Sequence, residues 1–137
     1  MNINAVTVFC GSKPGNDLAY VTAAENLGTM LAQNGITLVY GGGNKGIMGA
    51  LANSCLIAGG KVTGIIPKLL LEWEAQHEGL TELIVTESMH ARKLLLYEKC
   101  DVAVILPGGM GTLDELFEML TWNTLKIHDK KIILLNQ

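Results

Sequence analysis

A glycine-rich turn at residues 107–115 (PGGMGTLDE) carries the groups in this chain that are best suited to holding a phosphate. Gly109, Gly111 and Thr112 stand where an apolar run gives way to a helical pattern, so we expect a nest of N–H groups plus one hydroxyl. A helix N-terminus adds unpaired donors and a partial positive charge, which suit an anion. Thr112 and Glu115 also have the spacing of a capping box. The two roles are compatible, and the turn is a candidate monophosphate site.

A second glycine run, at residues 41–46 (GGGNKG), matches the G-x-G-x-x-G pattern of dinucleotide-binding turns. The companion of that pattern is an acidic residue about 20 positions further on, which binds the ribose hydroxyls. Residues 65–67 (IIP) stand there instead, so binding of a nicotinamide dinucleotide is disfavoured. Two interpretations remain open: a tight turn whose glycines let the next helix pack closely, and a loop that faces the substrate.

Five short apolar runs frame these turns, and a sixth, shorter run is a further candidate strand. The runs are rich in β-branched residues and do not alternate cleanly, as expected of strands buried on both faces of a parallel sheet. They occupy residues 5–10, 36–40, 61–66, 102–106 and 131–135, with residues 82–85 as the sixth. Helical patterns alternate with them at residues 17–34, 46–58, 89–100 and 113–126. We therefore predict one Rossmann-like nucleotide-binding domain over residues 1–137, with a doubly wound, mainly parallel sheet and helices on both faces.

Three of the predicted strands run directly into glycine-rich turns, which begin at Gly11, Gly41 and Pro107. In doubly wound sheets, ligands bind beyond the carboxyl ends of the strands, and glycine there lets backbone N–H groups approach the ligand. We therefore expect the binding site at this edge of the sheet.

Two motifs taken together, PGGMGTLDE at residues 107–115 and SMHARK at residues 88–93, resemble the paired motif of the Lonely Guy (LOG) phosphoribohydrolases. Further stretches agree in the family's order: FCGSKPGN at 9–16, LVYGGGNKGIMGALA at 38–52 and WEAQHEGLTEL at 73–83. The resemblance therefore covers the chain from its first predicted strand to its last. It implies a Rossmann-like enzyme that hydrolyses cytokinin nucleotides, such as isopentenyladenosine 5′-monophosphate, to free base and ribose 5-phosphate. Many bacterial members also accept AMP.

The resemblance also implies roles for individual residues. Arg92 and Glu115 match the catalytic arginine and glutamate of the family. The positions that hold the nucleotide match Glu74, Lys93, Gly109, Met110, Gly111, Thr112, Leu113, Asp114 and Thr121. Glycosidic cleavage passes through a state with positive charge on the ribose, which the Glu115 carboxylate can stabilise. Arg92 is always charged, so it suits polarising or positioning the substrate better than donating a proton.

Composition disfavours several other classes of protein. The formal net charge is −3 and no run of Lys or Arg exceeds two residues, so no nucleic-acid partner is expected. The three cysteines, Cys10, Cys55 and Cys100, are far apart, which indicates reduced core residues. The three histidines lack metal-ligand spacing, and we expect neither a metal nor a cofactor. Without a signal peptide or an apolar stretch of about 18 residues, no membrane contact is expected and a cytoplasmic location follows.

Members of this family often carry the label lysine decarboxylase, which the residues do not support. Such an enzyme needs a lysine that forms a Schiff base with pyridoxal phosphate. Lys93 stands beside Arg92 just after a helix start, where a basic group near a bound phosphate is the simpler interpretation. The main alternative to the enzyme is a non-catalytic nucleotide or molybdenum-cofactor carrier on the same fold. An inactive remnant and a DNA-processing relative are further alternatives.

The chain departs from the family pattern at two points. Ala91 stands where members often carry Glu or Gln, so the helix that follows Ser88 loses half of a capping box. The sequence stops at Gln137, just after its last apolar run, whereas members usually continue with at least another helix. We therefore expect a shortened form or a fragment that lacks the C-terminal helical segment and leaves one face of the sheet uncovered.

Two of the predicted helices carry more apolar surface than one core can cover. Residues 94–97 are apolar most of the way round a helical turn, and Met119 and Trp122 lie off the core stripe of their helix. Surplus apolar surface of this kind is typical of a subunit interface. We predict a homodimer or a higher homo-oligomer that binds a small nucleotide.

Overall fold

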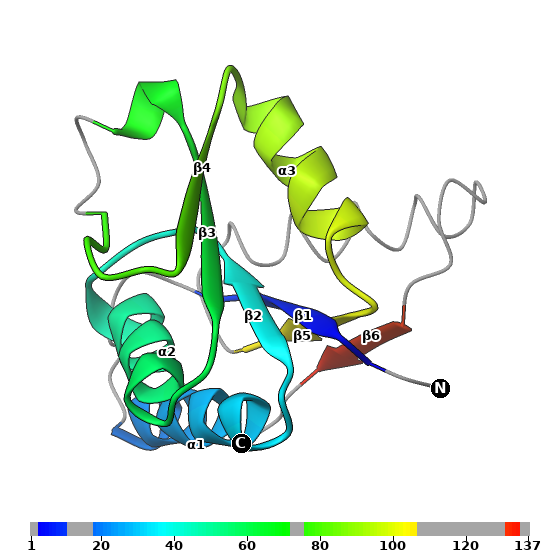
Figure 1. Cartoon of the computed structure of the whole chain (residues 1–137). Helices are drawn as coiled ribbons and strands as arrows, with labels where there is room; N and C mark the ends of the chain where they lie inside the picture. The colour runs from blue at the N-terminus through cyan, green and yellow to red at the C-terminus, as the bar shows by residue number, and fades with distance from the viewer. Residues whose placement is uncertain (1–2, 11–17, 72–75, 107–130, 135–137) are drawn as a thin grey trace.

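The computed structural model describes residues 3–10, 18–71, 76–106 and 131–134. Six strands form one sheet in the spatial order β4-β3-β2-β1-β5-β6, and every neighbouring pair is parallel (Figure 1). The strands are β1 (Ala5–Phe9), β2 (Thr37–Tyr40), β3 (Val62–Pro67), β4 (Glu82–Thr86), β5 (Val102–Ile105) and β6 (Lys131–Leu134). The helices are α1 (Leu18–Gln33), α2 (Gly46–Ile57), the short 3-10 helix η1 (Lys68–Leu70) and α3 (Met89–Glu98).

The predicted strands and helices are confirmed wherever they fall within the described part of the chain. The sixth candidate, residues 82–85, is β4 at the edge of the sheet. Small differences occur at the ends: Cys10 lies outside β1, Pro67 belongs to β3, and α3 ends at Glu98. The predicted helix at residues 113–126 lies outside the described residues.

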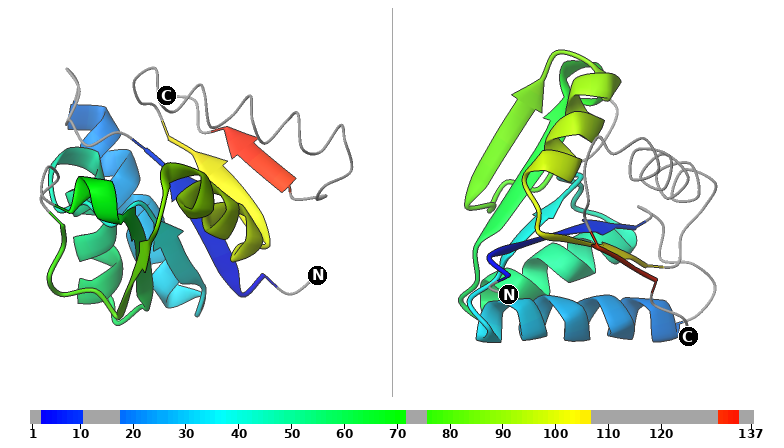
Figure 2. Two further views of the ribbon diagram at one scale, coloured as in Figure 1. Left: turned by 90° about the horizontal axis from the view of Figure 1, so that it is seen from above. Right: turned by 90° about the vertical axis from the view of Figure 1, so that its right-hand side faces the viewer.

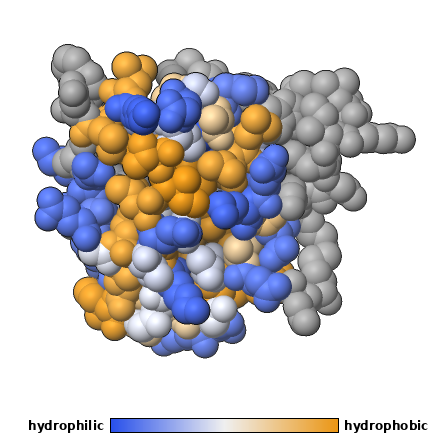
Figure 3. Space-filling model, turned by 45° about the horizontal axis from the view of Figure 1, so that its top comes forward, coloured by the Kyte–Doolittle hydropathy of each residue, from blue (hydrophilic) through white to orange (hydrophobic). Residues whose placement is uncertain are grey.

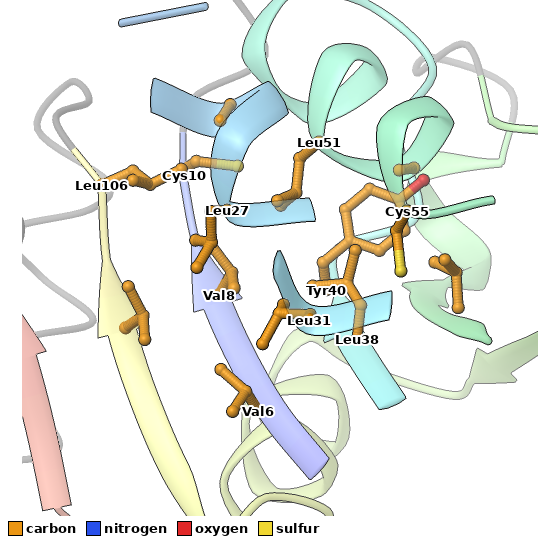
Figure 4. Packing of buried hydrophobic residues seen from close by; sticks show 14 of the residues in the cluster. Val6, Val8, Cys10, Leu27, Leu31, Leu38, Tyr40, Leu51, Cys55 and Leu106 are labelled. Atoms are coloured by element: carbon orange, nitrogen blue, oxygen red, sulfur yellow. The ribbon is translucent and has the colours of Figure 1, made fainter. Parts of the chain in front are cut away.

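Helices cover both faces of the sheet, as the apolar runs predict. α1 and α2 lie side by side on one face, and α3 lies on the opposite face (Figure 2). The larger hydrophobic core lies between the sheet and the first two helices, where Leu31, Leu38 and Leu51 are buried (Figure 4). A smaller core lies beneath α3, with the rings of Phe9 and Tyr97 5.6 Å apart. The fold is therefore a three-layer α/β arrangement in the Rossmann-like class.

Two glycines end the first two helices in the left-handed conformation. Gly35 has φ +68° and Gly59 has φ +86°, and each follows the last turn of its helix. A Cβ at either position would meet no atom within 4 Å, so the backbone angle alone favours glycine there.

The three cysteines are buried free thiols, which confirms their assignment to the core. Burial raises the pKa of the Cys55 thiol above its usual value and so favours the neutral form. Among the described helices, none has the length and apolarity needed to cross a membrane.

Candidate active site

The carboxyl ends of the strands meet at one edge of the sheet because all six strands run in the same direction. β1 is the switch point: the chain moves from β1 outward through β2, β3 and β4, and then returns to place β5 on the other side of β1. Ligands of doubly wound sheets bind at such a point. Of the three glycine-rich segments that the sequence predicts to be turns at this edge, Gly41–Gly43 lies within the described residues.

α3 brings Arg92 to this edge from the opposite face of the sheet. The helix begins after Ser88, whose hydroxyl oxygen accepts the N–H of Ala91 at 3.1 Å, and the Thr86 hydroxyl donates to the Ser88 carbonyl. The predicted N-cap is thus confirmed, and Ala91 does not prevent it. Arg92 follows in the first turn of the helix, only 8% exposed.

Two main-chain carbonyls hold the Arg92 guanidinium. Its Nε donates to the carbonyl of Ile65 at 2.9 Å, and its Nη2 donates to the carbonyl of Gly41 at 2.8 Å. The ladder between β2 and β3 ends at the pair Tyr40–Gly64, one residue before these two carbonyls. Buried carbonyls at the end of a ladder need another donor, and Arg92 supplies it.

This arrangement fixes the orientation of a permanent positive charge. Nε and Nη2 lie along one edge of the planar guanidinium, so two hydrogen bonds from that edge prevent the plane from turning. Both of these carbonyls are neutral groups that accept hydrogen bonds from the guanidinium. Arg92 is the only arginine in the 137-residue sequence, beside nine lysines. A buried charge is costly, and its place at the edge where doubly wound sheets bind ligands favours a functional role.

The glycine run Gly41–Gly43 is held by three different elements. The carbonyl of Gly41 accepts from Arg92 of α3, that of Gly42 accepts the His77 N–H at 2.9 Å, and that of Gly43 accepts the Tyr40 hydroxyl at 2.7 Å. Burial, and secondarily Cys10, raises the pKa of Tyr40 far above its usual value, so the hydroxyl keeps the proton that it donates. All three carbonyls of the run thus accept hydrogen bonds that hold this part of the fold together.

Close packing explains why this run consists of glycine. Gly42 has φ +82°, and a Cβ at Gly43 would lie 2.7 Å from the Sδ of Met48 on α2. These contacts support the first of the two interpretations of the turn, in which the glycines let the next helix pack closely. The contact with Arg92 adds a role that neither interpretation included. No sequence signal could have revealed it, because a main-chain carbonyl has no residue signature.

His77 lies in the polar stretch after β3, and sequence reasoning gave it no role. Its side chain is buried, its Nδ1 accepts the Gly79 N–H at 2.9 Å, and its Nε2 lies 2.6 Å from Oδ1 of Asn53 on α2. Since a backbone N–H can only donate, Nδ1 is the acceptor and Nε2 carries the proton toward Asn53. His77 therefore ties residues 76–79 to α2 and, through its N–H, to Gly42.

The structure places two of the predicted site residues. Arg92 is buried at the carboxyl edge of the sheet, and Lys93 is half-buried at the next position of α3. The predicted site residues outside the described part are Glu74, Gly109, Met110, Gly111, Thr112, Leu113, Asp114, Glu115 and Thr121. Within the described part, no group of three or more His, Cys, Asp or Glu side chains could hold a metal ion.

Comparison with known proteins identifies relatives along the whole chain. A family model described as "Possible lysine decarboxylase" matches residues 48–137. The cytokinin riboside 5′-monophosphate phosphoribohydrolase of Rhodococcoides fascians is 49% identical over 133 residues, which cover 96% of this chain and 67% of that protein. A protein of the same name from Arabidopsis thaliana is 45% identical, with 96% of this chain and 62% of that protein covered. This chain thus spans about two thirds of the length of these relatives.

Solved structures with the same fold include molybdenum cofactor carriers. The carrier protein of Chlamydomonas reinhardtii superposes with a TM-score of 0.79 at 23% identity, covering 97% of this chain and 76% of that one. The molybdenum cofactor binding protein of Rippkaea orientalis gives a TM-score of 0.79 at 27% identity, covering 100% of this chain and 78% of that one. These matches confirm the Rossmann-like α/β fold.

Proposed function

Since this chain belongs to the LOG family of phosphoribohydrolases, we propose that it hydrolyses the N-glycosidic bond of a nucleoside 5′-monophosphate. The substrate class is AMP or a cytokinin riboside 5′-monophosphate, and the products are the free base and ribose 5-phosphate. The proposal rests on the sole arginine of the chain, which is buried and held in one orientation at the carboxyl edge of the sheet. Arg92 is also the residue whose motif resembles that of the family's catalytic arginine.

The chemistry of the bond explains why a fixed cation is useful. As the C1′–N bond breaks, positive charge develops on the ribose and negative charge on the departing base. Water adds to C1′ and loses one proton, while the base gains a proton. Arg92 stabilises the electron-rich side of this separation or holds the ribose in place, and it needs no reorganisation to do so because two carbonyls already orient it.

The carboxylate partner in this proposal is Glu115, with the phosphate held by the turn at residues 109–114. The sequence predicts Glu115 in the first turn of a helix, where a carboxylate is favoured, and a carboxylate suits stabilising the ribose cation and orienting water. Glu74, Lys93 and Thr121 complete the nucleotide contacts. Binding energy from the remote 5′-phosphate supplies part of the cost of placing the scissile bond.

Two other readings of the family and fold are weaker. Decarboxylation would require a lysine that carries pyridoxal phosphate, and Lys93, one residue after Arg92 in the first turn of α3, is better explained as a group near the substrate phosphate. A cofactor carrier is favoured only by solved structures that are 23–27% identical to this chain. The relatives named phosphoribohydrolases are 44–49% identical over 96% of the chain, so the enzyme is the better supported function.

A panel of nucleoside 5′-monophosphates tests the function. Free base and ribose 5-phosphate should appear in equal amounts from AMP or from isopentenyladenosine 5′-monophosphate, followed by chromatography. Matching nucleosides without the phosphate should react poorly. Glu115→Gln and Arg92→Ala should each lower kcat/KM by about 100- to 1,000-fold, as removal of one group that stabilises a transition state does. Full activity in both variants would remove the proposed roles.

We also propose that the protein forms a homodimer. Leu69, Leu83, Val85 and Met89 are large apolar side chains exposed on η1, β4 and the start of α3. Figure 3 shows apolar side chains gathered in the middle of one face of the molecule. Of the surplus predicted at residues 94–97, Leu96 and Tyr97 are buried in the smaller core. Light scattering at micromolar concentration should give the mass of two chains, and a monomer at all concentrations would contradict this.

The three buried thiols bear on the compartment. Cys10, Cys55 and Cys100 are all free. Free core cysteines fit a reducing environment, so we place the protein in the cytoplasm. Fractionation of cells with an antibody against the chain would test this placement.

A further inference from the structure

We propose that Gly41 is a positioning residue of the active site, which acts through Arg92. Its carbonyl orients the guanidinium, and its missing side chain leaves the space that the guanidinium occupies. The inference rests on the proposed function for its effect on activity, whereas the geometry on which it is built does not.

A side chain at position 41 would conflict specifically with Arg92. A Cβ built at Gly41 would lie 2.5 Å from Nη2 of Arg92, and the next nearest atom, Cε of Met48, would be 3.4 Å away. Gly41 is absent from the described glycines with a positive φ, so an alanine there causes no backbone strain. The added methyl group therefore has one serious conflict, with the tip of a catalytic side chain.

When a methyl group is added at Gly41, either the backbone or the Arg92 side chain must move, and the surrounding contacts determine which one does. The backbone around Gly41 is buried and held on both sides, because Tyr40 ends β2 and the Gly42 carbonyl accepts the His77 N–H. The tip of a long side chain moves at lower cost than such a backbone. We therefore expect Gly41→Ala to keep the fold and to displace the guanidinium from the carbonyls of Gly41 and Ile65.

The first experiment observes Arg92 directly. Because the chain has one arginine, a ¹H–¹⁵N spectrum contains a single arginine Nε–H signal, and Arg92→Lys confirms its assignment by removing it. In the parent protein this proton should exchange slowly, because it is buried and bonded to Ile65. Gly41→Ala should shift the signal and speed its exchange. Gly43→Ala is the matched control, because its methyl group meets Met48 instead, and the signal should stay in place.

The second experiment measures activity in a double-mutant cycle. Gly41→Ala should lower kcat by roughly 10- to 100-fold, the size expected when a catalytic group moves by about 1 Å, with a smaller change in KM. In the Arg92→Ala background the same change should cost no further activity, because the group through which it acts is gone. The free energies of unfolding of the same variants should agree with this. Gly41→Ala should not destabilise the Arg92→Ala protein, because the conflicting atom is absent there.

Several results would overturn the proposal. They are an unchanged Nε–H signal in Gly41→Ala, an equal loss of activity in both backgrounds, or a failure to fold that persists when Arg92 is alanine. Failure of the proposed function looks different: the parent would release no base from any nucleotide. In that case the spectra still decide whether Gly41 orients Arg92.

Discussion

Two regions of this protein are held together by different kinds of interaction. The larger core, between the sheet and the helices α1 and α2, consists of apolar side chains such as Leu31, Leu38 and Leu51, each at most 1% exposed. The region around Arg92 is held by hydrogen bonds to main-chain carbonyls of Gly41 and Ile65. Burial of apolar surface stabilises the first region. Burial of the Arg92 charge in the second region costs free energy, but it fixes the position of that charge.

We expect this difference to separate the residues that stabilise the fold from those that serve the proposed chemistry. Apolar packing is non-directional and tolerates small rearrangements, whereas the guanidinium is fixed by the direction of two bonds. Changes in the larger core should therefore lower stability and leave the chemistry of the folded protein intact. Changes around Arg92 should alter activity more than stability.

Leu51→Ala is expected to have the largest effect on stability. Leu51 is fully buried on α2, and its truncation should lower the free energy of unfolding by about 2–5 kcal/mol through lost burial and a residual cavity. Urea unfolding followed by circular dichroism measures the loss. Well below the unfolding midpoint, kcat should match that of the parent. A large fall in kcat with no loss of stability would contradict the expectation that the larger core serves stability and not the chemistry.

Ser88→Ala should have an intermediate effect and should lower both stability and activity. The Ser88 hydroxyl oxygen caps α3 through the Ala91 N–H, and loss of an N-cap costs about 0.5–2 kcal/mol. Because Arg92 lies in the first turn of α3, fraying there should also lower kcat several-fold. Ser54→Ala is the control: this hydroxyl only bonds back to the Leu51 carbonyl within α2, so kcat should not change.

Tyr40→Phe should have the smallest effect and a distinctive pH dependence. Loss of the hydrogen bond to the Gly43 carbonyl should cost about 0.5–1.5 kcal/mol. Burial raises the pKa of Tyr40 in the folded state, so its contribution is complete below the usual pKa of 10.0 and is lost as pH rises above it.

The measurement is the free energy of unfolding of parent and Tyr40→Phe between pH 8 and 11. The difference between the two proteins should narrow above pH 10, where the tyrosine of the unfolded parent ionises while the folded one resists. A difference that widens with pH would contradict the assigned burial of the Tyr40 hydroxyl.

Much of the fold could be predicted because its signals lie in side-chain types. β-Branched runs mark the six strands, Gly35 and Gly59 mark helix ends, and Ser88 marks the start of α3. The site was predicted only in part. Arg92 was selected by its motif and its catalytic role stays a prediction, whereas the contacts that orient it use carbonyl groups, which every residue has.

The role of His77 was missed for a related reason. Its partners, Asn53 and Gly79, come from a helix 24 residues earlier and from the backbone two residues later, and no spacing rule connects them. The tertiary structure brings these groups together, and the sequence alone gives no indication of such contacts. The predicted roles of Arg92, Lys93, Glu115 and Glu74 stay predictions.

The most direct test of the central claim compares parent and Arg92→Ala proteins with AMP and isopentenyladenosine 5′-monophosphate, well below both unfolding midpoints. The parent should release base and ribose 5-phosphate in equal amounts, and Arg92→Ala should be slower by about 100- to 1,000-fold while its circular dichroism spectrum matches that of the parent. Equal turnover by the two proteins, or no base release by the parent, would contradict the account.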